Sequence, residues 1–160
     1  ERRAYYEVNA WGTKPEIPTH IKEVWFAGVH SDVGGSYPEP ESGLAKITLQ
    51  WMIEEARQFD LRIDAARYKR VVLGAGKRRD YVGPDAQGPI HRSLQYGWWI
   101  LEILPKNDAF KRWKYYLPLG RRRKIPEDAL IHQSVLDRMQ HGKYKPGNLP
   151  RQYKVEPWHR

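Results

Sequence analysis

The most informative segment of the chain runs from Val24 to Tyr37 and reads VWFAGVHSDVGGSY. Its apolar first part, Val24 to Ala27, has the β-branched and aromatic character of a buried strand. His30 and Asp32 follow just past the carboxyl end of this strand, where open α/β sheets build their sites. The stretch therefore predicts an α/β fold with a strand over residues 23–28 and a site at its end.

The His30 and Asp32 side chains are candidates for proton transfer. An imidazole takes and returns a proton near neutral pH, and an adjacent carboxylate can fix its tautomer. We expect His30 to act as general base and Asp32 to support it, and the alternative for His30 is a buried, hydrogen-bonded loop residue. Gly28, Gly34 and Gly35 are expected to shape the loop, because glycine permits a tight and closely approaching backbone.

After the strand we expect a glycine-rich loop over residues 29–43 and then a helix from Leu44 to Phe59. Apolar residues recur through this helix at the spacing of one helical face: Ala45, Leu49, Met52, Ala56 and Phe59. Polar residues such as Lys46 and Gln50 fall elsewhere, so the apolar face is expected to be the buried one.

The remainder of the chain has weaker patterns. Residues 62–90 are expected to be mostly irregular. After them we expect a helix over 91–104, a hairpin over 110–125 and a second helix over 134–140. Gly142 is expected to end the second helix in the left-handed conformation. The whole chain, 1–160, is expected to be a single, partial domain, and residues 141–160, which contain three prolines, to run over the surface as a tail.

Two short segments resemble each other, Ile90-His91-Arg92-Ser93-Leu94 and Ile131-His132-Gln133-Ser134-Val135. In each, the serine can cap the helix that follows. We expect both histidines to be structural and to make local hydrogen bonds.

Composition excludes several kinds of chemistry. The 160 residues are 40% hydrophobic and contain no cysteine, so disulfides, thiolate catalysis and cysteine-bound zinc are excluded within the chain. No serine lies in the Gly-x-Ser-x-Gly setting that a nucleophile elbow requires. His30 and Asp32 are too few to hold a metal ion, so neither a metal nor a cofactor is expected.

The segment from Val24 to Tyr37 resembles the signature of a bacterial and fungal family of α/β-hydrolase-like domains. This family includes the phospholipase effectors of type VI secretion systems. Residues 42–56 and the two Ile-His-x-Ser segments match further, although Ser36 replaces a glycine that is common in the motif. The resemblance implies a Ser-Asp-His hydrolase of lipase or phospholipase type, in which His30 is the base and the serine and acid lie upstream.

That resemblance makes the chain the C-terminal part of such a hydrolase, either a fragment or a truncated relative that opens on Glu1. It implies an ester or phospholipid as substrate and the missing N-terminal half of the same fold as partner. Such a part is expected to be inactive alone. For location, it implies a bacterial cytoplasm with delivery by a secretion system.

The net charge of +9 suits an anionic partner. A basic run follows an aromatic segment, and we expect it to contact anionic lipid at a membrane surface: Arg121, Arg122, Arg123 and Lys124. One alternative function is a non-catalytic interaction module derived from a hydrolase. A more distant one is nucleic-acid binding, which no recognisable motif supports.

Overall fold

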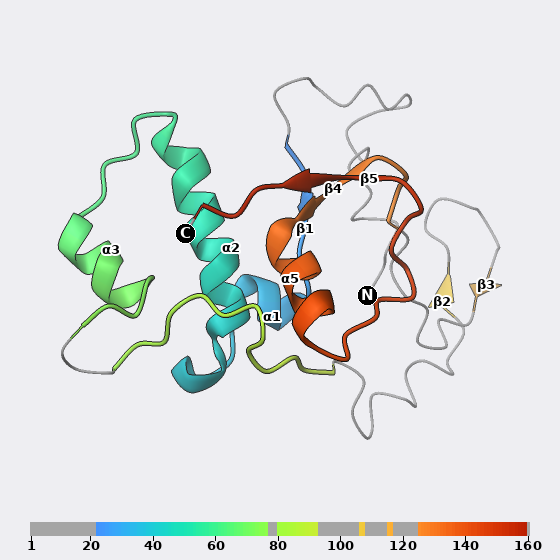
Figure 1. Ribbon diagram of the computed structural model, residues 1–160, viewed down its shortest axis with the longest axis horizontal. Coiled ribbons are helices and arrows are strands. Elements are labelled where there is room, and N and C mark those ends of the chain that lie inside the picture. The colour runs from blue at the N-terminus through green and yellow to red at the C-terminus, as the bar shows by residue number, and fades with distance from the viewer. Residues whose placement is uncertain (1–21, 77–79, 93–105, 108–114, 117–124, 160) are drawn as a thin grey trace. The chain divides into compact units, whose positions relative to one another are not determined.

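The computed structural model describes residues 22–76, 80–92, 106–107, 115–116 and 125–159. The chain divides into two compact units. One contains residues 24–93 and 127–160, and the other contains residues 1–23 and 94–126. The first unit combines a parallel sheet with helices, so the α/β expectation is confirmed (Figure 1).

The sheet of the first unit has three parallel strands in the order β1, β4, β5: β1 (Val24–Trp25), β4 (Ala129–His132) and β5 (Tyr153–Glu156). Ile131 in the central strand pairs with Trp25 on one side and Val155 on the other. Because all three strands are parallel, their carboxyl ends lie at one edge, where Asp32 follows β1. The expected strand is present but pairs over two residues only.

Five helical segments are described: α1 (His30–Gly34), the 3-10 turn η2 (Glu39–Glu41), α2 (Gly43–Arg57), α3 (Ala65–Val71) and α5 (Gln133–His141). The helices predicted over 44–59 and 134–140 are confirmed as α2 and α5. The loop prediction over 29–43 is wrong in part, since it contains α1 and η2. Likewise, α3 lies inside a stretch expected to be irregular, where Asp64 caps it by accepting a hydrogen bond from the Arg67 amide.

The predicted buried face of α2 is wrong. Residues on a different face are buried: Gly43, Leu44, Lys46, Ile47 and Gln50. Leu49 and Met52 are exposed, and Phe59, beyond the helix end, is 85% exposed. Two polar side chains can be buried because they are paired: Lys46 bonds the Val71 carbonyl at 2.6 Å, and Gln50 accepts from the Trp158 indole at 3.1 Å.

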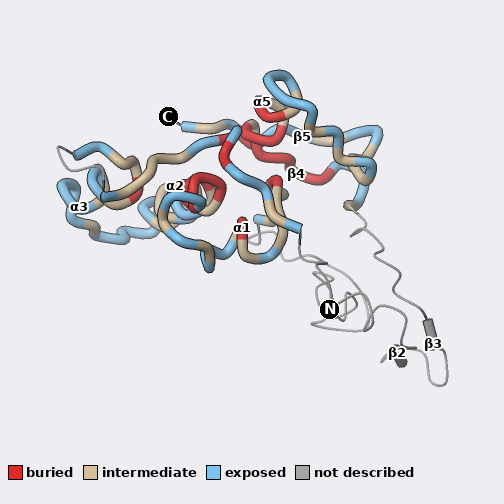
Figure 2. The backbone as a smooth tube through the Cα atoms, turned by 90° about the horizontal axis from the view of Figure 1, so that it is seen from below, coloured by how far each residue is buried: buried red, intermediate tan, exposed pale blue. Residues whose placement is uncertain are grey.

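The expected surface tail over residues 141–160 is instead partly built into the sheet. Tyr153–Glu156 forms β5, and Trp158 packs against the core cluster that includes Leu44 and Ile47. Figure 2 shows the buried residues gathered in β4, the start of α5 and one side of α2. Gly142 follows α5 in an extended conformation, with φ −142°, so the left-handed cap is also wrong.

Two further sequence predictions fall largely outside the described residues. The helix over 91–104 lies there except for residues 91 and 92, which are not helical. Of the hairpin over 110–125, β3 (Tyr115–Tyr116) is described, and it pairs antiparallel with β2 (Lys106–Asn107).

His132 rather than Ser134 caps α5. The His132 Nδ1 accepts hydrogen bonds from the Ser134 amide at 3.3 Å and from its hydroxyl at 2.8 Å, which is the local bonding expected. The imidazole is 1% exposed and stacks on Phe26 with ring centres 4.6 Å apart. Burial lowers the pKa of His132 to about 4, against the opposing effect of Glu156.

The buried His132 is expected to make folding sensitive to acid. Its pKa is lowered in the folded state, so the unfolded chain binds the proton first and stability falls as the pH drops from 6.5 toward 4. Between pH 7 and pH 5 the loss from this residue is about 2 kcal/mol. Urea unfolding across this range measures it. The control His132→Asn retains a capping acceptor without a titrating ring, and an equal pH slope in both proteins would contradict the assignment.

Candidate active site

Asp32 is fixed by its place in the first turn of α1. The strand β1 ends before Gly28, and α1 starts at His30, so Asp32 lies where its carboxylate can turn back to the helix start. Its Oδ2 accepts a hydrogen bond from the Val29 amide at 2.9 Å. The residue is 2% exposed, and a buried carboxylate needs several such donors to remain ionised.

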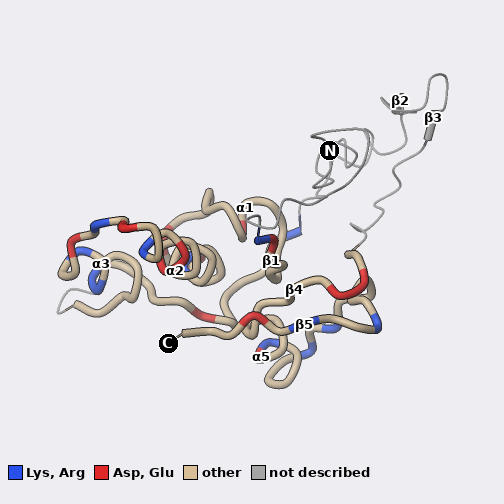
Figure 3. Tube along the Cα trace, turned by 90° about the horizontal axis from the view of Figure 1, so that it is seen from above, with Lys and Arg blue, Asp and Glu red and all other residues tan. Residues whose placement is uncertain are grey.

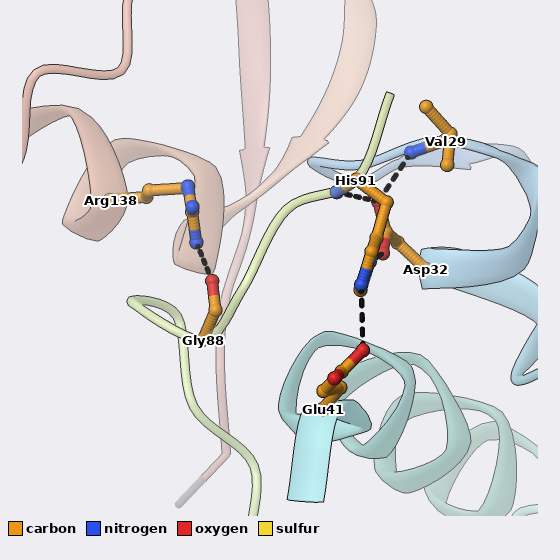
Figure 4. A network of polar contacts seen from close by, with 6 residues as sticks. All are labelled: Val29, Asp32, Glu41, Gly88, His91 and Arg138. Atoms are coloured by element: carbon orange, nitrogen blue, oxygen red, sulfur yellow. Dashed lines mark hydrogen bonds and ion pairs between the residues drawn. The ribbon is translucent and has the colours of Figure 1, made fainter. Parts of the chain in front are cut away.

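His91 brings the other donors to Asp32 from the segment 80–92. Its Nδ1 lies 2.6 Å from Asp32 Oδ1, and its backbone amide donates to Asp32 Oδ2 at 3.1 Å (Figure 4). The His91 side chain is 20% exposed, whereas the Asp32 side chain is fully buried. The pair thus has a buried acid that orients an imidazole with access to solvent, which is the arrangement of an acid and base in many hydrolases.

Glu41 and Tyr37 complete the surroundings of the His91 ring. Glu41 Oε2 lies 2.9 Å from His91 Nε2, on the side opposite Asp32. The Tyr37 ring stacks on the imidazole with centres 3.5 Å apart and planes 18° apart. The Glu41 side chain is about half exposed, so it can turn into water without leaving a buried charge behind.

The two carboxylates favour the charged form of His91. An ionised carboxylate only accepts hydrogen bonds, and the charged imidazole, with a proton on both ring nitrogens, can donate to Asp32 and to Glu41 at once. The hydrogen bond to Asp32 is the main reason that the pKa of His91 is raised above 6.5, and Glu41 raises it further. This stabilises the fold below pH 6.5, and the contribution is lost as the pH rises through the raised pKa.

His30, the expected base, does not take part in this pair. It is exposed at the start of α1, and within the described residues its imidazole makes no hydrogen bond. Asp32, expected to support His30, contacts His91 instead. His91 itself was expected to make local bonds, and this is wrong, because its partners lie 59 and 50 residues away in the sequence.

The three glycines of the loop differ in their surroundings. Gly28 has φ +119°, and a Cβ there would lie 2.5 Å from the Cβ of Asp32, so a side chain would displace the carboxylate. Gly35 has φ +77° and faces Ala45. Gly34 has open space around it. The backbone requirement for glycine is therefore strongest next to Asp32.

The proposed lipid contacts Arg121, Arg122, Arg123 and Lys124 lie outside the described residues, so that role stays a prediction. Around α3, basic and acidic residues lie side by side (Figure 3). No group of three or more potential metal ligands occurs in the part of the chain that the structure describes. Among the described helices, none is both long and apolar enough to cross a membrane.

The sequence missed three members of the site, because their roles depend on contacts between distant segments. His91 had a signal in the repeated Ile-His-x-Ser segment. Tyr37 lies at the end of the Val24–Tyr37 segment, two residues after the Gly-Gly pair. Glu41 had no signal, since it is one of several acidic residues in a proline-containing loop.

Comparison with known proteins links the first third of the chain to phospholipases. A family model described as T6SS, phospholipase effector Tle1-like, catalytic domain matches residues 1–55, which include Asp32 and Glu41. The uncharacterized protein YEL023C of Saccharomyces cerevisiae is 26% identical over 200 residues. That alignment covers 80% of this chain and 29% of the yeast protein, so the chain spans less than a third of that relative. No solved structure matches the chain. Residues 1–55 are therefore similar to the catalytic domain of type VI secretion phospholipase effectors.

Proposed function

We propose that the chain supplies the acid and the base of a serine hydrolase that cleaves phospholipid esters. Asp32 is the acid, and His91 is the general base in place of His30. The observation that carries the proposal is the 2.6 Å contact between the buried Asp32 carboxylate and His91 Nδ1. The similarity of residues 1–55 to a phospholipase catalytic domain supports lipid as the substrate class.

The chemistry follows from the two nitrogens of the His91 ring. Asp32 holds Nδ1–H, so a neutral ring carries its lone pair on Nε2 and can take the proton of a serine hydroxyl there. The imidazolium that forms then protonates the leaving alcohol. Asp32 stabilises the charged ring throughout, which is the role of the carboxylate in a triad.

Glu41 stands where the nucleophile's hydroxyl would have to be. Its carboxylate lies 2.9 Å from Nε2, and this contact favours the protonated ring. In the proposed reaction Glu41 turns toward water as the serine approaches. The ring then loses one of its two carboxylate contacts, and the pKa of His91 moves back toward the neutral range that a base requires.

The nucleophile itself is proposed to come from a part of the protein outside these 160 residues. Four of the five serines are described, and Ser134 is bound to His132 in the core while Ser42 donates to the Glu39 carbonyl. No serine oxygen is hydrogen-bonded to His91 in the described part of the chain.

Contact of Arg121–Lys124 with anionic lipid is proposed as the membrane anchor of the same protein.

Two measurements on the full-length protein test this function. A fluorophosphonate probe is expected to label one serine, and phosphatidylglycerol vesicles are expected to release fatty acid at a rate that parallels labelling. Heat-unfolded protein controls for labelling of ordinary serines. Folded protein that neither takes up the probe nor hydrolyses vesicles would overturn the proposal and favour a non-catalytic interaction module.

A further inference from the structure

Arg138 is a buried cation that binds the segment leading to His91. It lies in α5 and is 8% exposed. Its Nη1 donates to the Ala86 carbonyl at 2.7 Å. The same nitrogen donates to the Gly88 carbonyl at 2.8 Å (Figure 4). Gly88 is three residues before His91, so Arg138 holds the backbone of this segment immediately before the proposed base.

Burial of the Arg138 charge costs free energy of folding, and packing alone gives no reason for a charged side chain at this place. Its Nε is buried without a hydrogen-bond partner, and within the described ranges no carboxylate lies at ion-pair distance from the guanidinium. The ring of Tyr144 lies 5.5 Å away and offers a weaker cation contact. A buried charge with neutral partners is expensive, and an apolar side chain would fill the same space more cheaply.

Apart from the bonds of His91 itself, the residues before it, 85–90, have few other attachments to the helices, and these are to α2 and α5. The Asp85 amide donates to the Gly43 carbonyl at the start of α2, at 3.1 Å. The Gln87 side chain donates to the Asp137 carbonyl of α5 at 3.2 Å and is exposed. The two Arg138 bonds are buried, short and donated by a charged group, so among the attachments of residues 85–90 they constrain the backbone most.

We propose that Arg138 is a positioning residue that fixes the 86–88 backbone on α5 and thereby sets the His91 ring against Asp32. Three residues span at most about 10 Å, so a shift of the Gly88 backbone is expected to displace His91 as well. A misplacement of about 1 Å is enough to lower a catalytic rate strongly. The catalytic meaning of this role rests on the proposed function, whereas the positioning itself does not.

The titration of His91 tests the positioning without any need for hydrolysis. The imidazole signals of the histidine-labelled full-length protein are followed by NMR against pH. Arg138→Met removes both hydrogen bonds to the 86–88 backbone and keeps a long apolar stem. The titration midpoint of His91 is therefore expected to fall toward 6.5, because the ring moves away from Asp32 and Glu41. Arg138→Lys keeps the charge and a donor, and it is expected to restore most of the shift.

Val135→Ala is the matched control, because Val135 is also buried on α5 but makes no bond to the 86–88 segment. It is expected to destabilise the protein and leave the His91 midpoint unchanged. An unchanged midpoint in folded Arg138→Met protein would overturn the proposal. In the hydrolysis assay, Arg138→Met is expected to lose about 10- to 100-fold in kcat. A shifted midpoint in a protein that never hydrolyses lipid would leave Arg138 as a positioning residue and reject the proposed function.

Discussion

Replacing His91 by alanine in the full-length protein is expected to lower the rate of phospholipid hydrolysis by about 10²- to 10⁴-fold, the usual contribution of a general base. The His91 Nδ1 is held 2.6 Å from a buried carboxylate, and its ring keeps access to solvent. His30→Ala is expected to retain most activity, because His30 is exposed on α1 and lies apart from this pair. Initial rates on vesicles and on a soluble ester measure both variants.

The loss in His91→Ala is expected in kcat rather than in KM, because the imidazole acts on a proton in the transition state. His141→Ala is the matched control. Like His30, His141 is an exposed histidine of a helix, and among the described residues its ring forms one hydrogen bond, with the Asp137 carbonyl. Loss of activity in His30→Ala with full activity in His91→Ala would return the base to His30.

One half of the candidate site could be predicted from the sequence, and the other half could not. A carboxylate just past the end of a strand is a local pattern, so Asp32 could be chosen from the chain alone. Its partner could not, because His91 lies 59 residues away and reaches Asp32 through a segment without regular structure. His30 was expected to be the base because it follows the strand and lies in the segment that resembles the hydrolase signature, but in a helix residues two apart, such as His30 and Asp32, point to different sides.

Contacts between distant segments, which a local sequence pattern does not contain, also explain the errors in the predicted fold. The hydrophobic pattern located α2 correctly and then indicated the wrong buried face. Lys46 and Gln50 are buried there because each finds partners in distant segments, Val71 for the lysine and Trp158 for the glutamine. The strand β5 was missed because Lys154 and Val155 are both exposed and the segment lies between prolines, which is typical of a loop.

Asp32→Asn is expected to impair both folding and hydrolysis. The carboxylate accepts from the Val29 amide, the His91 amide and the His91 ring, and an asparagine offers one oxygen and an NH2 group that would face one of these donors. Unfolding experiments are expected to show a loss of about 2–4 kcal/mol. The largest cause of the raised pKa of His91 is also removed, so its NMR midpoint is expected to fall.

For hydrolysis, the same variant is expected to lose about 10²- to 10⁴-fold in kcat, because an amide at this position favours the wrong tautomer of the base. The matched control is Asp64→Asn, which makes the same chemical change at the start of α3. There the side chain accepts one hydrogen bond, from the Arg67 amide, and asparagine is an equally good cap. Stability and activity are both expected to stay near wild type in the control. If Asp32→Asn lost stability but kept its kcat, Asp32 would be a structural residue of α1, and His91 would act without it.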